Sequence, residues 1–287
     1  MLVRTCWGSA TDRGTVRAVN EDAALTYPPL FLVADGMGGH DAGDLASRIA
    51  VEEFAQMAGA EFVSADEVRA AFDRTVARIR AEFTQGRQGG TTLAGVAVTD
   101  QAGMPFWLVF NIGDSRVYRW TDDTGLAQVS VDHSVVQDLV DKGFLSPDEA
   151  ERHPERHVLT RALGTNGAAE VDYWMLPAAG GDRMMVCTDG LTRELRHDEI
   201  AEVLRANPEP KTAAVALVNE AVRRGARDNV TVVVVDMALA DVESDMEFDR
   251  RHATARRAAG TSPVSSRGWD EMLDGVTLPR RNYVEER

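Results

Sequence analysis

The sequence has only two cysteines, which is too few for a disulfide framework. Both Cys6 and Cys187 lie in apolar, strand-like stretches, where a free thiol normally packs as a small core residue. No apolar run reaches the roughly 18 to 20 residues of a membrane helix, and residues 1–9 hold no long apolar segment of the kind found in a secretion signal. We therefore expect a cytoplasmic protein that does not bind a membrane.

Positive charge is in deficit, because 31 Lys and Arg residues stand against 46 Asp and Glu residues, for a formal net charge of −15. The phosphates of a nucleic acid would be repelled by such a chain unless a local basic face compensated. We therefore expect no nucleic-acid partner.

Two motifs of other enzyme classes are incomplete. His153 and His157 have the spacing of a zinc-protease helix, but Pro154 follows His153 where that motif requires Glu. Gly36 and Gly38 lack the third glycine of a dinucleotide-binding fingerprint. These departures argue against a zinc protease and against a dinucleotide-dependent enzyme.

Four short acidic motifs stand where apolar runs meet turns: Glu21-Asp22, Asp35-Gly36, Asp189-Gly190 and Asp228-Asn229. Any one of them alone is better explained as a turn dipeptide. Strand ends are rigid places to hold ligands, and carboxylates gathered from distant parts of a chain repel one another unless cations lie between them. Oxygen ligands favour Mg²⁺ or Mn²⁺ over zinc. The four motifs together therefore predict an oxygen-lined metal site.

These motifs belong to a longer ordered series that runs from about Ser9 to Asp236. The series reads Asp12-Arg13-Gly14, Arg17 with Asn20-Glu21-Asp22, Asp35-Gly36-Met37-Gly38-Gly39, Gly90-Thr91-Thr92, Gly113-Asp114-Ser115-Arg116, Asp132-His133-Ser134, Asp189-Gly190-Leu191 and Asp228-Asn229-Val230-Thr231. In this order the chain resembles the type 2C family of metal-dependent serine/threonine protein phosphatases, in its bacterial form. The resemblance implies an α+β fold, an α-β-β-α sandwich of two mainly antiparallel sheets flanked by helices, with metals between the sheets at one end.

The resemblance also implies the chemistry, which is hydrolysis of a phosphate monoester by a water molecule that two Mn²⁺ or Mg²⁺ ions activate. Transferred to this sequence, Asp35 would bridge the ions, Asp189 and Asp228 would hold the first, and the Gly36 carbonyl with Glu21 and Asp22 would serve the second, partly through water molecules.

Arg17 matches the phosphate-binding arginine of the family. A guanidinium suits this role, because it can bind two phosphate oxygens while staying charged. The alternative is a surface ion pair between Arg17 and Glu21.

The sequence departs from the family pattern at two positions. Met37 occupies the place where animal relatives carry a histidine proposed as general acid, and a thioether cannot donate a proton. We therefore expect a metal-bound water to protonate the leaving oxygen. Arg193 stands four residues after Asp189, where relatives typically present an Asp that joins Asp114 in holding a third metal. We expect Arg193 to pair with Asp114 in place of that ion, or Glu194 to replace the missing ligand.

Apolar periodicity predicts helices over residues 41–57, 66–83, 197–205 and 211–224. Strands are predicted over 92–99, 106–112, 117–120, 126–131 and 230–235, and the first four are expected to form one antiparallel meander. Ser64 with Glu67, and Ser146 with Glu149, are capping-box signatures at the start of two helices. We place the phosphatase domain over residues 1–240. Within it, residues 132–164 form a small helical insertion, which by resemblance is the flap beside the active site.

Residues 241–287 lose the apolar periodicity and are predicted to be a flexible tail, in which Trp269, Met272 and Leu273 are spaced like a short amphipathic anchor. The expected substrates are proteins phosphorylated on Ser or Thr by a partner kinase, by family resemblance alone. Two alternatives stay open, a phosphatase dedicated to one phosphoserine regulator and a phosphoprotein-binding regulatory module whose catalysis is weakened by Arg193. The presence of Asp35, Asp189 and Asp228 favours an enzyme.

Overall fold

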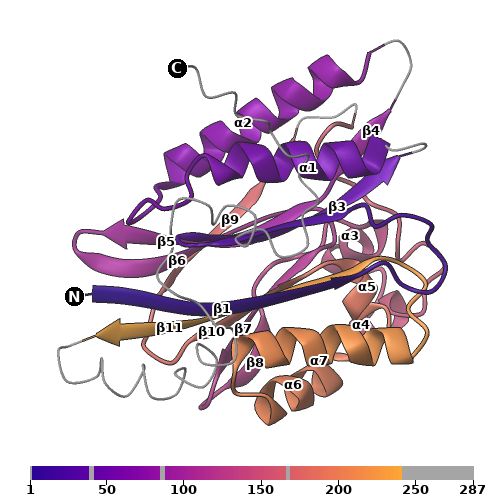
Figure 1. The fold of residues 1–287 in the computed structure, drawn as a ribbon. Coiled ribbons are helices and arrows are strands. Elements are labelled where there is room, and N and C mark those ends of the chain that lie inside the picture. The colour runs from indigo at the N-terminus through magenta and orange to yellow at the C-terminus, as the bar shows by residue number, and fades with distance from the viewer. Residues whose placement is uncertain (1, 39–41, 85–87, 166–168, 241–287) are drawn as a thin grey trace, which may run out of the picture.

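Two antiparallel sheets pack face to face in the computed structural model, which describes residues 2–38, 42–84, 88–165 and 169–240 (Figure 1). The first sheet has the order β1 (Leu2–Asp12), β11 (Val230–Ala240), β10 (Arg183–Cys187), β7 (Arg116–Thr121), β8 (Gly125–Gln128). The second has the order β2 (Asp22–Tyr27), β3 (Leu30–Gly38), β5 (Leu93–Gln101), β6 (Met104–Ile112), β9 (Asp172–Pro177), with β4 (Gly89–Thr91) paired to β3. The tail predicted over residues 241–287 lies outside the described residues.

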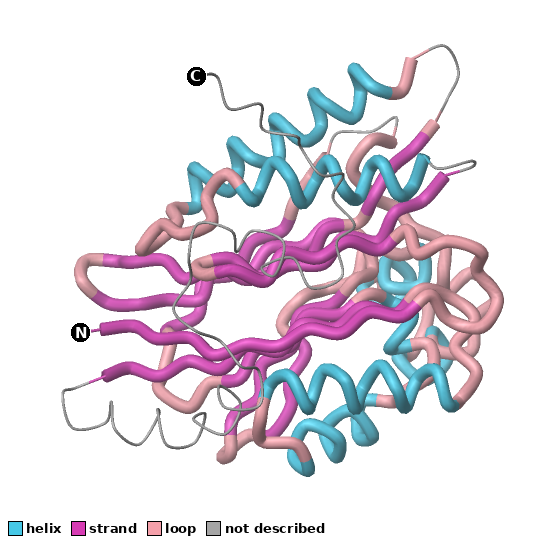
Figure 2. The backbone as a smooth tube through the Cα atoms, in the orientation of Figure 1, coloured by secondary structure: helices cyan, strands magenta, loops and turns pink. Residues whose placement is uncertain are grey.

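Helices cover both outer faces of this sheet pair. The second sheet is covered by α1 (Ala42–Ala55) and α2 (Ala65–Glu82), and the first by α6 (His197–Ala206) and α7 (Pro210–Arg223). Three short helices gather at one end of the sandwich, namely α3 (Val135–Asp141), α4 (Pro147–Ala150) and α5 (Asp189–Thr192) (Figure 2). The predicted α-β-β-α sandwich is confirmed, and so are the helices predicted near residues 41–57, 66–83, 197–205 and 211–224.

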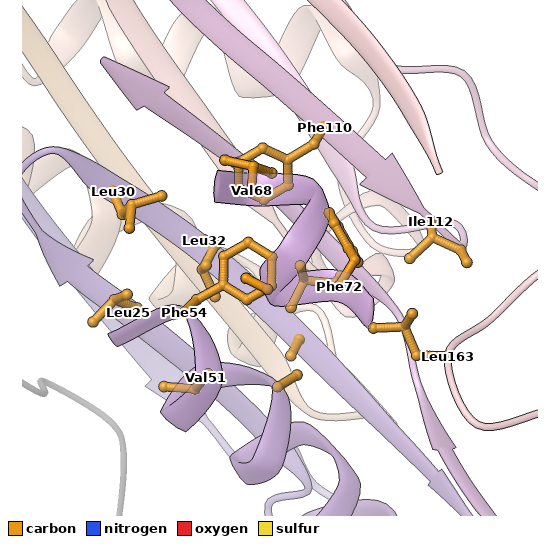
Figure 3. Packing of buried hydrophobic residues seen from close by; sticks show 14 of the residues in the cluster. Leu25, Leu30, Leu32, Val51, Phe54, Val68, Phe72, Phe110, Ile112 and Leu163 are labelled. Atoms are coloured by element: carbon orange, nitrogen blue, oxygen red, sulfur yellow. The ribbon is translucent and has the colours of Figure 1, made fainter. Parts of the chain in front are cut away.

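The core between the second sheet and its helices shows why these segments fold as they do. Phe54 of α1 and Phe72 of α2 meet edge to face with ring centroids 5.0 Å apart, and both rings contact Phe110 of β6 (Figure 3). Such aromatic pairs stabilise a core beyond the area that they bury. The capping box at Ser64 is confirmed, because the Glu67 N–H donates to Ser64 Oγ and the Ser64 N–H donates to the Glu67 carboxylate. The capping box at Ser146 and Glu149 is confirmed as well.

The prediction of one four-stranded meander was wrong. The strands form two hairpins, β5–β6 in the second sheet and β7–β8 in the first, and the chain crosses between the sheets over residues 113–115. Gly113 makes this crossing with a φ of 111°, a backbone conformation that side chains disfavour. Strand β11 is also longer than predicted and runs to Ala240, because it pairs with β1 along the whole of that strand.

No helix in the described ranges is long and apolar enough to cross a membrane. Both cysteines are free thiols in strands, as expected. Cys187 is buried in β10, and Cys6 is half-buried in β1.

Candidate active site

Two of the predicted carboxylates face each other across a single strand pair. Asp22 begins β2, and the antiparallel register places it directly opposite Asp35 on β3. Residues opposite each other in such a pair lie within about 5.5 Å at the backbone. The Asp35 backbone is fixed in turn by Thr92, between β4 and β5, since the Asp35 N–H donates to Thr92 Oγ1 at 3.0 Å and the Asp35 carbonyl accepts from the Thr92 N–H at 2.9 Å.

The opposite sheet holds Asp22 by two hydroxyl groups. Its Oδ2 atom accepts hydrogen bonds from Thr188 Oγ1 at 2.9 Å and from Thr231 Oγ1 at 2.7 Å. Thr188 follows β10 and Thr231 lies on β11, so these bonds join the two sheets at the end where the acidic motifs lie. The other oxygen, Oδ1, is buried and has no hydrogen-bond partner within the described chain.

Asp189 and Asp228 enter from the first sheet. Asp189 is the first residue of α5, directly after β10, and Asp228 precedes β11. Asp189 is buried, and its Oδ1 atom, like that of Asp22, lacks a partner in the part of the chain that the structure describes. Gly190 lets α5 lie against the backbone of Asn229, because a Cβ atom at Gly190 would stand 2.0 Å from the Asn229 carbonyl oxygen.

We expect Gly190→Ala to lower the free energy of unfolding by about 2 kcal/mol, because the added methyl group meets a backbone atom that cannot turn away. The displacement of α5 should also move Asp189 and reduce activity. Urea denaturation measures the first effect. Gly180→Ala is the matched control, because the Cβ atom there would have its nearest neighbour, the Leu239 nitrogen, at 3.5 Å. Equal stability of the two variants would contradict the close approach.

Asp114 and Glu21 complete the acidic group. Asp114 is 8% exposed and lies in the turn that His133 holds, since the Gly113 N–H donates to His133 Nδ1 at 3.2 Å and the His133 N–H donates to the Gly113 carbonyl at 2.9 Å. Glu21 is held from both sides, because its N–H donates to Asn229 Oδ1 at 2.9 Å and its carbonyl accepts from Ser47 Oγ at 2.6 Å. The N–H of Gly36 donates to the same Glu21 carbonyl at 3.2 Å.

The carboxylates lie close enough to change one another's proton affinity. Burial raises the pKa of Asp35 well above its usual value, and repulsion from Asp22, Asp189, Asp114 and Asp228 raises it further. Burial and the neighbouring Asp189 likewise raise the pKa of Asp114. The structure therefore brings together the acidic residues that the sequence separates by as many as 207 positions, from Glu21 to Asp228.

The buried Asp22 predicts how the stability of the metal-free protein depends on pH. Its pKa is raised to about 7, first because burial disfavours the charged carboxylate. The unfolded chain loses this proton near pH 4, so the folded state binds more protons between about pH 4 and pH 7. In excess chelator, Asp22 should therefore make the free energy of unfolding fall as the pH rises through this window, and Asp35 and Asp114, whose pKa values are raised as well, act in the same direction. Urea denaturation across the window measures this. Asp22→Asn should make the dependence shallower, and a rise with pH would contradict the assignment.

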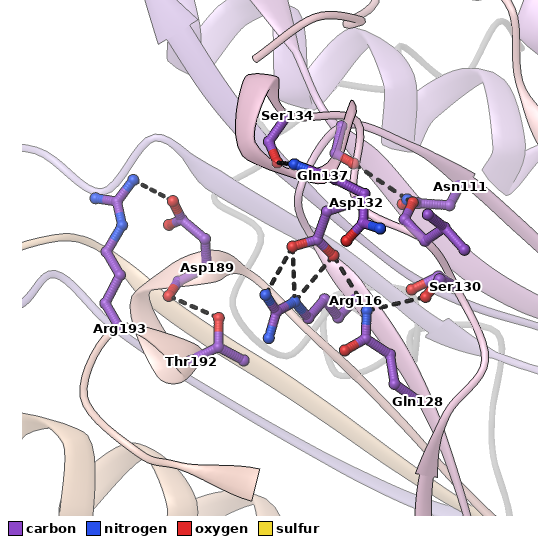
Figure 4. A network of polar contacts seen from close by, with 12 residues as sticks. Asn111, Arg116, Gln128, Ser130, Asp132, Ser134, Gln137, Asp189, Thr192 and Arg193 are labelled. Atoms are coloured by element: carbon purple, nitrogen blue, oxygen red, sulfur yellow. Dashed lines mark hydrogen bonds and ion pairs between the residues drawn. The ribbon is translucent and has the colours of Figure 1, made fainter. Parts of the chain in front are cut away.

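Two arginines form ion pairs with the carboxylates that the first sheet contributes. Arg17 Nε lies 2.7 Å from Asp228 Oδ1, so its observed partner is Asp228 rather than Glu21. Arg193 forms an ion pair with Asp189 (Figure 4) and another with Asp228. The prediction of an ion pair between Arg193 and Asp114 was wrong. Arg193 acts on Asp114 only through longer-range attraction. The i, i+4 spacing of Asp189 and Arg193 around α5 explains the preference.

The donor set fits a hard divalent cation. Carboxylate oxygens are the ligands that such ions prefer, and the buried, unpartnered oxygens of Asp22 and Asp189 require a partner. Among the described residues no three His, Cys, Asp or Glu side chains are arranged to hold an ion as they stand. The carboxylate of Asp189 pairs with Arg193, and that of Asp228 pairs with both Arg193 and Arg17.

Several supporting residues had no role assigned from the sequence. Thr188 and Thr231 hold Asp22, Asn229 holds the loop before it, and His133 holds the turn that carries Asp114. The signal that could have identified the two threonines is a hydroxyl residue beside the apolar runs of β10 and β11. Met37 is half-buried on β3, while Gly39 and His40 lie outside the described residues.

A pocket of about 430 Å³ opens beside Asp228. It is lined by residues from four segments: Val16, Arg17, Arg156, His157, Gly190, Arg193, Glu194, Arg227 and Asp228. Arg156 and His157 belong to the insertion over residues 132–164, so this segment borders the predicted site.

Comparisons with known proteins agree with this geometry. The model of the family described as protein phosphatase 2C matches residues 16–241. The serine/threonine phosphatase stp of Listeria innocua is 33% identical over 239 residues, which cover 80% of this chain and 94% of that protein. A crystal structure of the Mycobacterium tuberculosis serine/threonine phosphatase PstP superposes with a TM-score of 0.75 at 35% identity, over 83% of this chain and 100% of the other. The PstP catalytic domain has also been solved in complex with two manganese ions, and it matches over the same shares with a TM-score of 0.74 at 35% identity.

Proposed function

The chain belongs to the protein phosphatase 2C family, and we propose that it hydrolyses phosphoserine and phosphothreonine in proteins with the help of two Mn²⁺ or Mg²⁺ ions. One observation carries the proposal. Five aspartates from both sheets converge at one end of the sandwich, and two of them present buried oxygens without a partner in the described chain. The two manganese ions of the PstP catalytic domain support the choice of metal.

Each predicted ligand has a place in this proposal. Asp35 stands among the other carboxylates and would be a ligand of both ions, Asp189 and Asp228 would hold one ion, and the Gly36 carbonyl with Glu21 and Asp22 would serve the other. When bound, the two ions supply an activated water molecule as the nucleophile and neutralise charge on the phosphoryl group. Thr188 and Thr231 orient the Asp22 carboxylate from the opposite sheet.

Arg17 is assigned to the substrate phosphate. Its side chain is 50% exposed beside Asp228 and lines the pocket, so it can reach a ligand from the solvent side. A guanidinium binds two phosphate oxygens with parallel hydrogen bonds. Met37 cannot donate a proton, so no side chain in this proposal acts as general acid. A third ion at Asp114 would have to bind without a carboxylate at position 193, and Glu194 lies near enough to line the same pocket.

The test is hydrolysis of a small aryl phosphate and of a phosphothreonine peptide in the presence of Mn²⁺ and after thorough chelation. We expect turnover of both substrates that chelation abolishes and added Mn²⁺ restores. Turnover that persists in chelator would contradict the metal-dependent mechanism. The ion pairs of Arg193 with Asp189 and Asp228 favour one second function, a phosphoprotein-binding module with weak catalysis. Binding of the phosphopeptide without turnover would establish that module.

We also propose, from the family resemblance, that the substrates are cytoplasmic proteins phosphorylated by a partner serine/threonine kinase. Comparing the phosphoproteomes of cells that carry the wild type or Asp189→Asn would identify these substrates. No change in any phosphorylation site, with an active purified wild type, would contradict this part of the proposal.

A further inference from the structure

The pocket beside Asp228 is rich in arginine although the chain as a whole is acidic. Four of its nine lining residues are arginines, Arg17, Arg156, Arg193 and Arg227, whereas the formal net charge of the chain is −15. They come from four separate segments: the loop before β2, the turns after α4, the end of α5, and the loop before β11. The fold therefore gathers positive charge at the mouth of the candidate active site.

Two of these arginines carry charge that no carboxylate compensates. Arg17 and Arg193 pair with Asp228, and Arg193 also pairs with Asp189. Arg156, by contrast, donates only to the backbone carbonyl of His153, at 3.3 Å, and Arg227 forms no hydrogen bond or ion pair with any residue that the structure describes.

Some exposed arginines elsewhere on this surface have an acidic partner, whereas others, such as Arg80 and Arg152, have none among the described residues. Arg69 pairs with Asp66, Arg223 with Glu220, and Arg224 with both Glu199 and Glu220. Arg156 and Arg227 are both exposed and both line the pocket, so their guanidinium groups are available to an incoming ligand.

Two of these arginines also act on His157, which lines the same pocket. Its pKa is lowered to about 4, first by desolvation and then by repulsion from Arg193 and Arg156. A positive potential that disfavours a second positive charge favours an anion by the same interaction. The volume of about 430 Å³ is that of a small-ligand site and exceeds what one phosphate group needs.

We propose that Arg156 and Arg227 bind a second anionic group of the phosphoprotein substrate, beside the phosphate that is hydrolysed. The enzyme then prefers phosphorylated sites flanked by a carboxylate or by another phosphate, because guanidinium groups bind both anions with paired hydrogen bonds. This inference rests on the proposed phosphatase function, since it assigns specificity residues to that same site. It makes the insertion over residues 132–164 a contributor to substrate choice, through Arg156.

The test compares kcat/KM for phosphothreonine peptides that differ only in the flanking residues: alanine, aspartate, a second phosphothreonine, or lysine. For the wild type we expect the peptide with anionic flanks to exceed the alanine peptide by about tenfold. The aspartate and phosphothreonine arms show which anion the pocket binds better. In the double variant Arg156→Ala/Arg227→Ala this ratio should fall close to one, mainly through KM.

Arg152→Ala is the matched control, because Arg152 is an exposed arginine of the same insertion that does not line the pocket. It should keep the wild-type ratio. The charge-reversed variant Arg156→Glu/Arg227→Glu should prefer the lysine-flanked peptide, a result that loss of structure alone would not produce.

A wild-type ratio near one, or an unchanged ratio in both double variants, would overturn the inference while leaving the proposed function intact. If the wild type hydrolyses neither the peptides nor an aryl phosphate with Mn²⁺, the proposed function itself fails. The two failures are therefore distinguishable in one set of measurements.

Discussion

Replacing Asp35 with asparagine should lower kcat/KM for an aryl phosphate by about 10³-fold or more. Asp35 stands among Asp22, Asp189, Asp114 and Asp228, and it is the residue assigned to bridge both ions. A neutral amide supplies one weak oxygen ligand where a carboxylate supplies two charged ones. Both ions should therefore bind more weakly in the variant, and calorimetric titration with Mn²⁺ measures this separately from turnover.

The same substitution should act in the opposite direction on the metal-free fold. The raised pKa of Asp35 means that the surrounding carboxylates and burial disfavour its charge. Asparagine removes that charge, so in excess chelator near neutral pH the variant should melt at a higher temperature than the wild type. Asp73→Asn is the matched control, since Asp73 is exposed on α2, and it should change neither quantity. A variant that lost activity and stability together in chelator would indicate a structural role for Asp35.

Replacing Arg193 with aspartate should destabilise the metal-free protein and strengthen metal binding. Without ions, Arg193 compensates Asp189, which is buried, and Asp228. Losing one partner of a mostly buried ion pair costs about 3 kcal/mol, which lowers the melting temperature of a domain of this size by about 10 °C. With Mn²⁺ present, the cation that competes for Asp189 and Asp228 is gone and position 193 carries a carboxylate, so the affinity for Mn²⁺ should rise by about tenfold or more.

Thermal melts in chelator and in Mn²⁺, together with calorimetric titration, measure both effects of Arg193→Asp. Arg152→Asp makes the same charge change at an exposed arginine away from the carboxylates and should leave both quantities near the wild type. If Arg193→Asp bound Mn²⁺ no more tightly than the wild type, Arg193 would not compete with the ion. The result also decides whether this position limits catalysis, as the weakened-module alternative requires.

Much of the fold was predictable because the signals were local. The helices α2 and α4 begin at capping boxes, and an apolar run leads to each predicted strand-end carboxylate. The prediction of one meander was wrong because β6 and β7 join different sheets. The change of direction at Gly113 carries no distinctive pattern that says which sheet the next strand joins. Strand pairing is set by tertiary packing, which periodicity along one strand does not report.

In the candidate site, too, residue identities were predictable from the sequence, whereas contacts between distant residues were not. Asp22, Asp35, Asp189 and Asp228 could be named because motif order reports residue identity. The partner of Arg193 was mispredicted because the family comparison directed attention to Asp114, whereas the i, i+4 spacing within the chain pointed to Asp189. The hydroxyl groups that hold Asp22 lie 166 and 209 residues further along the chain, and no short-range pattern reveals such contacts.

The bonds from Thr188 and Thr231 to Asp22 have a consequence for how the enzyme loses activity. They fasten one layer of the sandwich to the other at the catalytic end, and each layer has its own apolar contacts with its own helices. The two sheets also share a buried apolar core, so a slight sliding of the layers at the catalytic end would disassemble the reaction centre before that core opened. Inactivation should thus precede unfolding when the protein is heated. Contacts that hold the two layers together at this end should raise the temperature of inactivation more than the temperature of unfolding.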